Sequence, residues 1–140
     1  MSLFNVMDIS STGMHAESIR LNTTASNVAN ANSVSSSYGE TYKARHAVFA
    51  AEMKQATDHQ RVGSKVNVLG VVESAKPLQV EYSPNHPMAN QEGYIFKPNV
   101  NVVEEMANML SASKAYETNV QVADTTKRLF RRVMQLGQGR

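Results

Sequence analysis

The sequence predicts a mainly α protein, in which two long terminal helices flank a small β-containing insertion. Both ends of the chain carry apolar residues at alternating spacings of three and four, which is the period of one helix face. All four prolines lie between residues 77 and 98, so neither end contains the residue that interrupts a helix most strongly. Between the ends, β-branched and aromatic residues change to a period of two, which indicates strands.

The first helix is predicted from about Leu3 to Asn32. Its residues fall into two heptad rows, one of Met7, Met14, Leu21 and Val28, the other of Phe4, Ser11, Ser18 and Ala25. The small residues of the second row would let a partner helix approach closely. The helix fades into a run rich in Asn and Ser, residues 25–37, whose side chains compete for local backbone groups. On composition alone, this run is either a fraying end with a flexible linker or an ordered contact.

The middle of the chain predicts two or three strands, over residues 42–49, 65–73 and 78–82. Glycines and prolines lie between these runs and supply the turns. A hairpin or meander of this size is marginally stable alone, so it needs another element to pack against.

The last helix is predicted from about Val100 to Leu136, after Pro98 and Asn99, which we interpret as a stop and a cap. Its apolar rows include Met106, Met109, Tyr116, Val120 and Phe130, and a second apolar face develops near its end. A lone pair of helices would cover only one face of each. The remaining apolar stripes therefore predict a higher assembly.

Convergent polar groups of the kind that catalysis requires are missing from the pattern. The chain has no cysteine, and its four histidines are scattered without the spacing of metal ligands. Glu104 and Glu105 are adjacent, so on a helix they point about 100° apart and belong in the first turn, where the helix dipole favours acids. We therefore predict no catalytic residue, no cofactor and no metal.

The C-terminal end is basic, with Lys127, Arg128, Arg131, Arg132 and Arg140 and no acid among the last sixteen residues. One interpretation is a polyanion-binding patch. We favour placement at a helix C-terminus, with the side chains pointing in different directions and pairing with Glu104, Glu105 or Glu117 of neighbouring subunits. The net charge of +2 does not indicate nucleic-acid binding. No apolar run is long enough for membrane insertion, and the N-terminus lacks the pattern of a cleavable signal peptide.

Two terminal motifs and one central motif resemble a known family. Residues 25–32 and 109–120 resemble the N-terminal and C-terminal signatures of the bacterial flagellar rod and hook proteins. Residues 82–90 and 93–106 are similar to the proximal rod subunit, the C member of the rod operon. The resemblance covers nearly the whole chain, except the polar residues 50–65.

This resemblance implies the fold and the function. The terminal helices, residues 1–36 and 100–140, would pack as an antiparallel coiled coil in the inner-tube domain of the flagellar basal body, with residues 37–99 as the β insertion. The protein would be a structural subunit of the proximal rod that transmits torque and forms the export channel wall. It would be exported to the periplasmic space by the flagellar type III route, without a cleavable signal. The runner-up is a cytoplasmic helical adaptor or basic-tailed binding protein.

The expected partners are neighbouring copies, other flagellar rod subunits and the basal-body adaptor and membrane ring. Asn27, Asn30 and Asn32 would satisfy polar groups at the turn that leaves the inner helix. The predicted subunit interface consists of Met7, Met14, Leu21, Asn27, Val28, Asn30, Asn32, Met106, Met109, Tyr116, Asn119, Val120 and Phe130.

Overall fold

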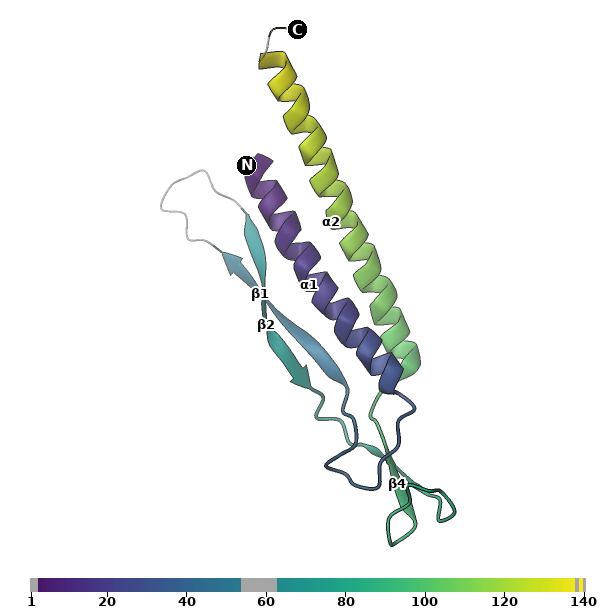
Figure 1. The fold of residues 1–140 in the computed structure, drawn as a ribbon. Helices are drawn as coiled ribbons and strands as arrows, with labels where there is room; N and C mark the ends of the chain where they lie inside the picture. Colours follow the sequence, from purple (N-terminus) through teal and green to yellow (C-terminus); the bar gives the residue numbers. More distant parts are fainter. Residues whose placement is uncertain (1–2, 54–62, 138, 140) are drawn as a thin grey trace. The chain divides into compact units, whose positions relative to one another are not determined.

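In the part of the chain that the structure describes, one long helix precedes four strands in the sequence and a second long helix follows them (Figure 1). The computed structural model describes residues 3–53, 63–137 and 139. In that part of the chain the elements are α1 (Leu3–Asn30), β1 (Arg45–Met53), β2 (Ser64–Glu73), β3 (Gln79–Tyr82), β4 (Tyr94–Lys97) and α2 (Val102–Gly137). The mainly helical class with a small β insertion is confirmed.

Both helices lie close to their predicted bounds, because no proline interrupts them. The predicted cap of α2 is wrong by two residues. The side-chain oxygen of Asn101, not Asn99, accepts from the backbone N–H groups of Val103 at 3.1 Å and Glu104 at 3.4 Å. Asn99 lies three residues before the start of α2, and its side-chain amide bonds to backbone groups of the loops instead.

The strands form two separate two-stranded sheets, β1–β2 and β3–β4. β3 pairs antiparallel with β4, and Val80 faces Phe96 while Tyr82 faces Tyr94. The prediction missed β4, although Tyr-Ile-Phe between Gly93 and Pro98 is a short β-prone run. A four-residue strand is specified largely by its neighbours: β3 pairs with one edge, and Ser35 bridges Phe96 on the other.

The described chain divides into two compact units, each built from segments distant in sequence. Unit 1 comprises residues 1–19, 48–70 and 111–140, and unit 2 comprises residues 20–47 and 71–110. The buried hydrophobic residues described in unit 1 are Ala16 and Ala112, whereas unit 2 buries Ala44, Leu78, Ile95 and Val100. Unit 2 therefore has the more substantial core, because an alanine removes little apolar surface from water.

Candidate assembly interface

The side chain of Asn27 is the centre of a hydrogen-bond network in unit 2. Its amide nitrogen donates to the Arg45 carbonyl at 2.8 Å and to the Glu105 carboxylate at 3.0 Å. Its oxygen accepts from the Tyr42 hydroxyl and the Arg45 N–H, both at 2.9 Å. These four bonds use the whole hydrogen-bonding capacity of an asparagine side chain, which has no exposed surface here. Asn27 thereby ties α1, the start of β1 and the first turn of α2 together.

Glu105 occupies this network as a buried acid, only 3% exposed. Besides the bond from Asn27, its other oxygen lies 4.0 Å from His46 Nδ1. The adjacent Glu104 points to the surface, where it pairs with Lys76 at 3.6 Å. The prediction that these neighbouring acids lie in the first helical turn and do not share a site is confirmed.

A second asparagine, which the sequence analysis treated only as a cap, organises the loops of unit 2. Asn99 Oδ1 accepts from the Ala44 N–H at 2.8 Å, and its amide nitrogen donates to the carbonyls of Lys76 at 2.6 Å and Ser74 at 3.4 Å. Ser74 also donates its N–H to the Ala44 carbonyl at 2.7 Å. The Pro98-Asn99 pair before α2 was the only local signal for this role, and it could not identify the partners, which are 23 to 55 residues away in the sequence.

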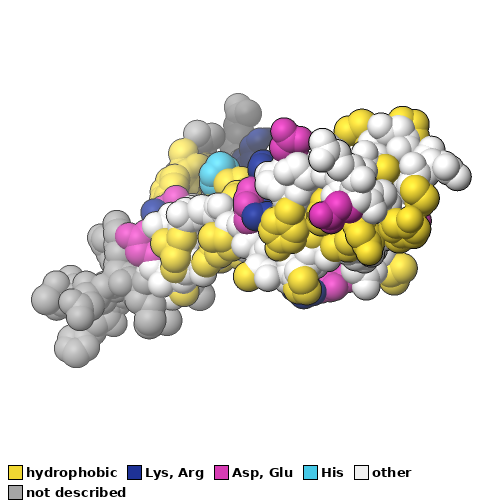
Figure 2. Space-filling model, turned by 90° about the horizontal axis from the view of Figure 1, so that it is seen from below, with side chains coloured by type: hydrophobic (Ala, Val, Ile, Leu, Met, Phe, Trp, Pro, Cys, Tyr) yellow, Lys and Arg dark blue, Asp and Glu magenta, His cyan; other side chains and the backbone are white. Residues whose placement is uncertain are grey.

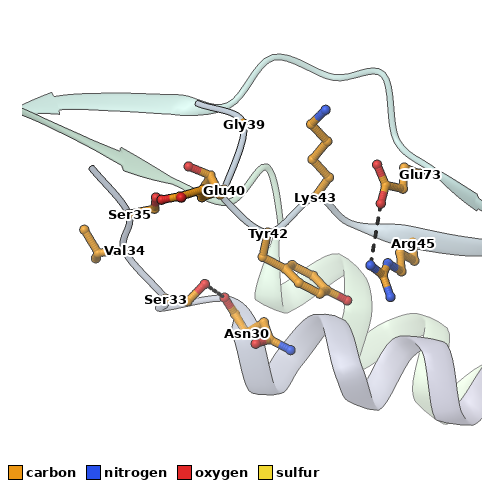
Figure 3. A pocket seen from close by; sticks show the side chains of 11 residues that line it. Asn30, Ser33, Val34, Ser35, Gly39, Glu40, Tyr42, Lys43, Arg45 and Glu73 are labelled. Carbon is orange, nitrogen blue, oxygen red and sulfur yellow. Dashed lines mark hydrogen bonds and ion pairs between the residues drawn. The ribbon is translucent and has the colours of Figure 1, made fainter. Parts of the chain in front are cut away.

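The segment between α1 and β1 is ordered by short-range contacts rather than forming an unstructured linker. Asn30 donates to the Ser26 carbonyl and accepts at its own carbonyl from the Ser33 hydroxyl, both at 2.8 Å. Figure 3 shows Asn30 and Ser33 at one side of a polar pocket of ≈ 450 Å³, with Arg45 and Glu73 paired at the other. Asn32 is exposed on the neighbouring stretch.

The two helices meet along small and polar residues within each unit. In unit 2, Arg20 donates to Asn108 at 3.4 Å and Asn27 donates to Glu105. In unit 1, the Phe4 and Phe130 rings make an edge contact with centroids 5.3 Å apart. Gly13 faces Asn119 so closely that an added Cβ would lie 2.9 Å from its amide nitrogen. The helix face buried in the chain runs through Ser10, Gly13, Ala16, Thr24 and Asn27.

The predicted apolar rows lie beside this buried face. Met7, Met106, Tyr116 and Val120 are exposed, and Met14, Leu21, Val28, Met109, Asn119 and Phe130 are half-buried. Asn119 and Phe130 contact α1 in their own chain, whereas the exposed members contact solvent in the single chain. Their role between subunits stays a prediction. The side chain of Asn27 is fully buried within its own chain, so it cannot contact another subunit directly.

Large hydrophobic side chains remain uncovered along both helices and on the sheets. Figure 2, a view from below, shows yellow hydrophobic side chains gathered in patches at the end of the molecule that carries β4. The large exposed hydrophobic side chains of unit 1 are Phe4, Met7, Val48, Phe49, Leu69, Tyr116, Val120, Val122, Leu129, Val133, Met134 and Leu136. Exposure of so many large hydrophobic side chains is typical of a surface used for association.

The acids predicted to pair with neighbouring subunits have partners within their own chain. Glu105 bonds to Asn27, Glu104 pairs with Lys76, and Glu117 accepts from Lys114 at 2.9 Å. The hydrogen bond and charge of Lys114 lower the pKa of the Glu117 carboxyl, and the same contact raises the pKa of Lys114. Both groups are exposed, so solvent screens their attraction and the pair contributes little to stability.

The basic residues 127, 128, 131 and 132 at the end of α2 lie within one half of the helix surface, although the first and last of them point about 140° apart. At about 100° per residue, positions 127, 128, 131 and 132 fall within an arc of about 140°. Thr126 and Phe130, which are buried and half-buried, lie on the other side. The intervening apolar positions, 129, 130 and 133, lie outside that arc.

The described residues contain no group of three or more His, Asp or Glu side chains arranged to hold a metal ion. Among the helices described, none combines the length and the apolar character that a membrane span requires.

Comparison with known proteins gives a family match at both ends of the chain. The family described as "Flagella basal body rod protein" matches residues 7–35, and "Flagellar basal body rod FlgEFG protein C-terminal" matches residues 91–136. The flagellar basal-body rod protein FlgC of Salmonella typhimurium is 41% identical over 138 residues, which covers 99% of this chain and 100% of that protein.

FlgC proteins of two further bacteria are also similar to this chain. FlgC of Yersinia enterocolitica is 41% identical over 140 residues, and FlgC of Borreliella burgdorferi is 32% identical over 152 residues. Each alignment covers 99% of this chain and 100% of the relative. The predicted resemblance is thus confirmed over the full length. The chain belongs to the FlgC family of flagellar basal-body rod proteins, and its predicted role as a structural subunit of the rod is confirmed.

Proposed function

We propose that this rod subunit transmits torque and forms part of the export channel wall by packing its terminal helices into a tube. The observation that carries the proposal is the imbalance in unit 1. Its described buried hydrophobic residues are two alanines, while twelve large hydrophobic side chains are exposed. Such a unit has too little core to be stable alone. Neighbouring subunits that covered the exposed side chains would supply the missing apolar burial.

Helix contacts support an antiparallel coiled coil in the inner-tube domain. In unit 2, Asn27 of α1 bonds to Glu105 of α2, and the earlier residue Arg20 bonds to the later residue Asn108. In unit 1, Gly13 of α1 lies against Asn119 of α2, and the earlier residue Phe4 contacts the later residue Phe130. Opposite progression in each unit is what antiparallel helices require. Small residues at the seam permit close approach of the two backbones.

The proposed division of labour follows the chain. Residues 1–36 and 100–140 would form the tube wall, and residues 37–99 would project from it as the β insertion. The helix side chains left exposed, among them Met7, Met106, Tyr116 and Val120, would contact neighbouring subunits. The names of the relatives place them in the basal-body rod. We infer the same surroundings here: other rod subunits, the basal-body adaptor and membrane ring, and the periplasm, reached without a cleaved signal.

The test replaces one apolar position on each helix in cells that lack their own copy of the gene. Leu21→Asp and Val120→Asp each place a charge in a packed interface, where desolvation costs several kcal/mol, on the order of 2–5. We expect swimming to be lost while secretion of the variant subunit continues. Asn22→Asp, at an exposed position of the same helix, is the matched control. Normal swimming with both interface variants would refute the proposed tube packing.

A further inference from the structure

An exposed aromatic face lies on the β3–β4 sheet of unit 2. Val80 and Tyr82 on β3 are opposite Phe96 and Tyr94 on β4, and the Tyr38 ring contacts Phe96 with centroids 6.2 Å apart. We call these five residues the aromatic face. Tyr82 is 64% exposed, and Val80, Tyr38 and Tyr94 are also exposed. Ile95, on the opposite side of the same strand, is only 2% exposed, so one side of this sheet packs inward. The other side is largely exposed, although Phe96 is half-buried and Lys43 Nζ lies 5.8 Å from the centroid of the Tyr38 ring.

The aromatic face is held in a fixed arrangement by the turn beneath it. Asn90 Oδ1 accepts from the N–H groups of Glu92 at 3.0 Å and Tyr94 at 2.9 Å. Gly93 adopts φ 83°, and a Cβ there would lie 2.9 Å from the Tyr82 ring. The Tyr82 and Tyr94 rings pack edge to face at 5.2 Å. A preorganised face of tyrosines loses little entropy on binding, which is typical of interface hot spots.

A matching cationic surface lies on α2. We call Lys127, Arg128, Arg131 and Arg132 the basic stripe, since they share one side of the helix and all are exposed. Arg128 pairs with Asp124 at 2.9 Å. Lys127, Arg131 and Arg132 form no ion pair with any residue that the structure describes. Guanidinium groups stack on tyrosine rings through cation–π attraction, and Arg and Tyr are the residues most enriched at interface hot spots.

The charges of the two units favour an encounter between two chains. Unit 1, which carries the basic stripe, has nine Lys and Arg against six Asp and Glu, a net charge of +3. Unit 2, which carries the aromatic face, has five against six, a net charge of −1. Glu92, exposed in the turn before Tyr94, adds a carboxylate beside the aromatic face.

The basic stripe lies in the last third of α2. α2 begins at Val102, five residues after β4 ends, and is continuous to Gly137. About 25 residues of helix, roughly 37 Å at 1.5 Å per residue, separate its first residue from the basic stripe.

We propose that the basic stripe of one copy binds the aromatic face of a second copy. The contact joins two different surfaces, so each added copy leaves one stripe and one face open for the next. Such a head-to-tail contact continues without closing, unlike a twofold dimer. The inference rests on the proposed function, because an open assembly is what a rod subunit builds. It adds a contact outside the helix pair and names the residues on both sides.

The test uses the absence of cysteine in the chain. A double variant, Val80→Cys with Arg132→Cys, is produced in cells without their own copy, and isolated basal bodies are treated with a short bismaleimide. We expect a ladder of cross-linked dimers and longer multimers. Val80→Cys with Lys114→Cys, an exposed lysine of α2 outside the stripe, is the control. The stripe pair should give about tenfold more cross-linked product, because binding raises the effective concentration of the two thiols.

Equal yields from the two pairs would overturn the inference.

If the cysteine variants do not assemble, a charge exchange decides instead: Arg131→Glu with Arg132→Glu should abolish swimming, and adding Tyr82→Lys should restore it. Absence of restoration would then overturn it. Tight, salt-sensitive binding of purified protein to duplex DNA or anionic vesicles, with equal cross-linking, would assign the stripe to a polyanion. If Leu21→Asp still stops swimming, the proposed tube packing survives any of these failures.

Discussion

Single asparagines determine much of the local structure of this chain. Asn27, Asn90, Asn99 and Asn101 each hold backbone groups that secondary structure leaves unpaired. An amide suits these positions because it donates and accepts at once and carries no charge. A carboxylate at position 27 could not donate to Glu105 and would place two acids about 3 Å apart in a buried site.

Removal of the Asn27 amide should destabilise unit 2 strongly. Asn27→Leu keeps a similar volume but leaves the Glu105 carboxylate and the Arg45 N–H buried without this partner. We expect a loss of about 2–4 kcal/mol in the free energy of unfolding, since each abandoned polar group costs about 1–3 kcal/mol. Urea unfolding followed by tyrosine fluorescence measures it, because Tyr42 binds the same amide.

Asn22→Leu serves as the control for that change, because Asn22 is exposed on the same helix. Its unfolding midpoint should barely move. A second variant, Asn27→Leu with Glu105→Met, removes the abandoned carboxylate as well and should recover part of the lost stability. Equal midpoints for Asn22→Leu and Asn27→Leu would mean that the network contributes nothing to folding.

At the scale of elements, the helices pair mainly through small and polar residues, and apart from the Phe4–Phe130 contact most of their larger side chains stay exposed. Ala16 and Ala112 are buried, while Leu129 and Val133 are exposed. This distribution is the reverse of a self-sufficient two-helix bundle, whose larger apolar residues face inward. It explains why the predicted heptad rows and the face buried within the chain differ.

Close helix approach at Gly13 gives a prediction in which two effects oppose each other. Gly13→Ala gains helix propensity, about 1 kcal/mol, but its Cβ would lie 2.9 Å from Asn119 Nδ2. Overpacking of a tight contact costs about 1–3 kcal/mol, so we expect a net loss. The thermal resistance of isolated basal bodies should fall with this variant.

Two further variants separate propensity from packing. Gly13→Ala with Asn119→Ala removes the obstructing amide and should restore or exceed the original thermal resistance. Gly137→Ala changes a glycine whose added Cβ meets nothing within 4 Å, so it should leave the resistance unchanged. If Gly13→Ala alone is as heat-resistant as the original chain, the Asn119 side chain can move aside with little loss of stability.

At the scale of the whole molecule, assembly should determine how much of the helix forms. α1 and α2 contain 28 and 36 residues. In unit 1 they bury two alanines among the described hydrophobic residues, and long helices without packing are marginal in water. We expect dilute monomer to show far less helix by circular dichroism than the 64 residues of both helices, with the part in unit 2 retained. A cooperative, fully helical monomer would contradict the assembly proposal.

The sequence alone indicated the helices, the β insertion and the family. The helices and the β insertion depend on local physics: proline positions, the 3.6-residue period and the change to a period of two between the ends. The family was indicated by the resemblance of residues 25–32, 82–90, 93–106 and 109–120 to known motifs. The same periodicity identified both ends as apolar on more than one side, which pointed to assembly. The short strand β4 and the cap at Asn101 were missed, because a four-residue run and neighbouring asparagines carry little local signal.

Only the tertiary structure decided which groups meet. No spacing in the sequence relates Asn27 to Glu105, or Asn99 to Ala44, because these pairs are 78 and 55 residues apart. Contacts at such separations depend on how the whole chain packs, whereas local patterns report only what neighbouring residues favour. For the same reason, the sequence established that apolar surface would remain, and the structure decided which side chains present it: large residues of the helices and the aromatic face of the small sheet.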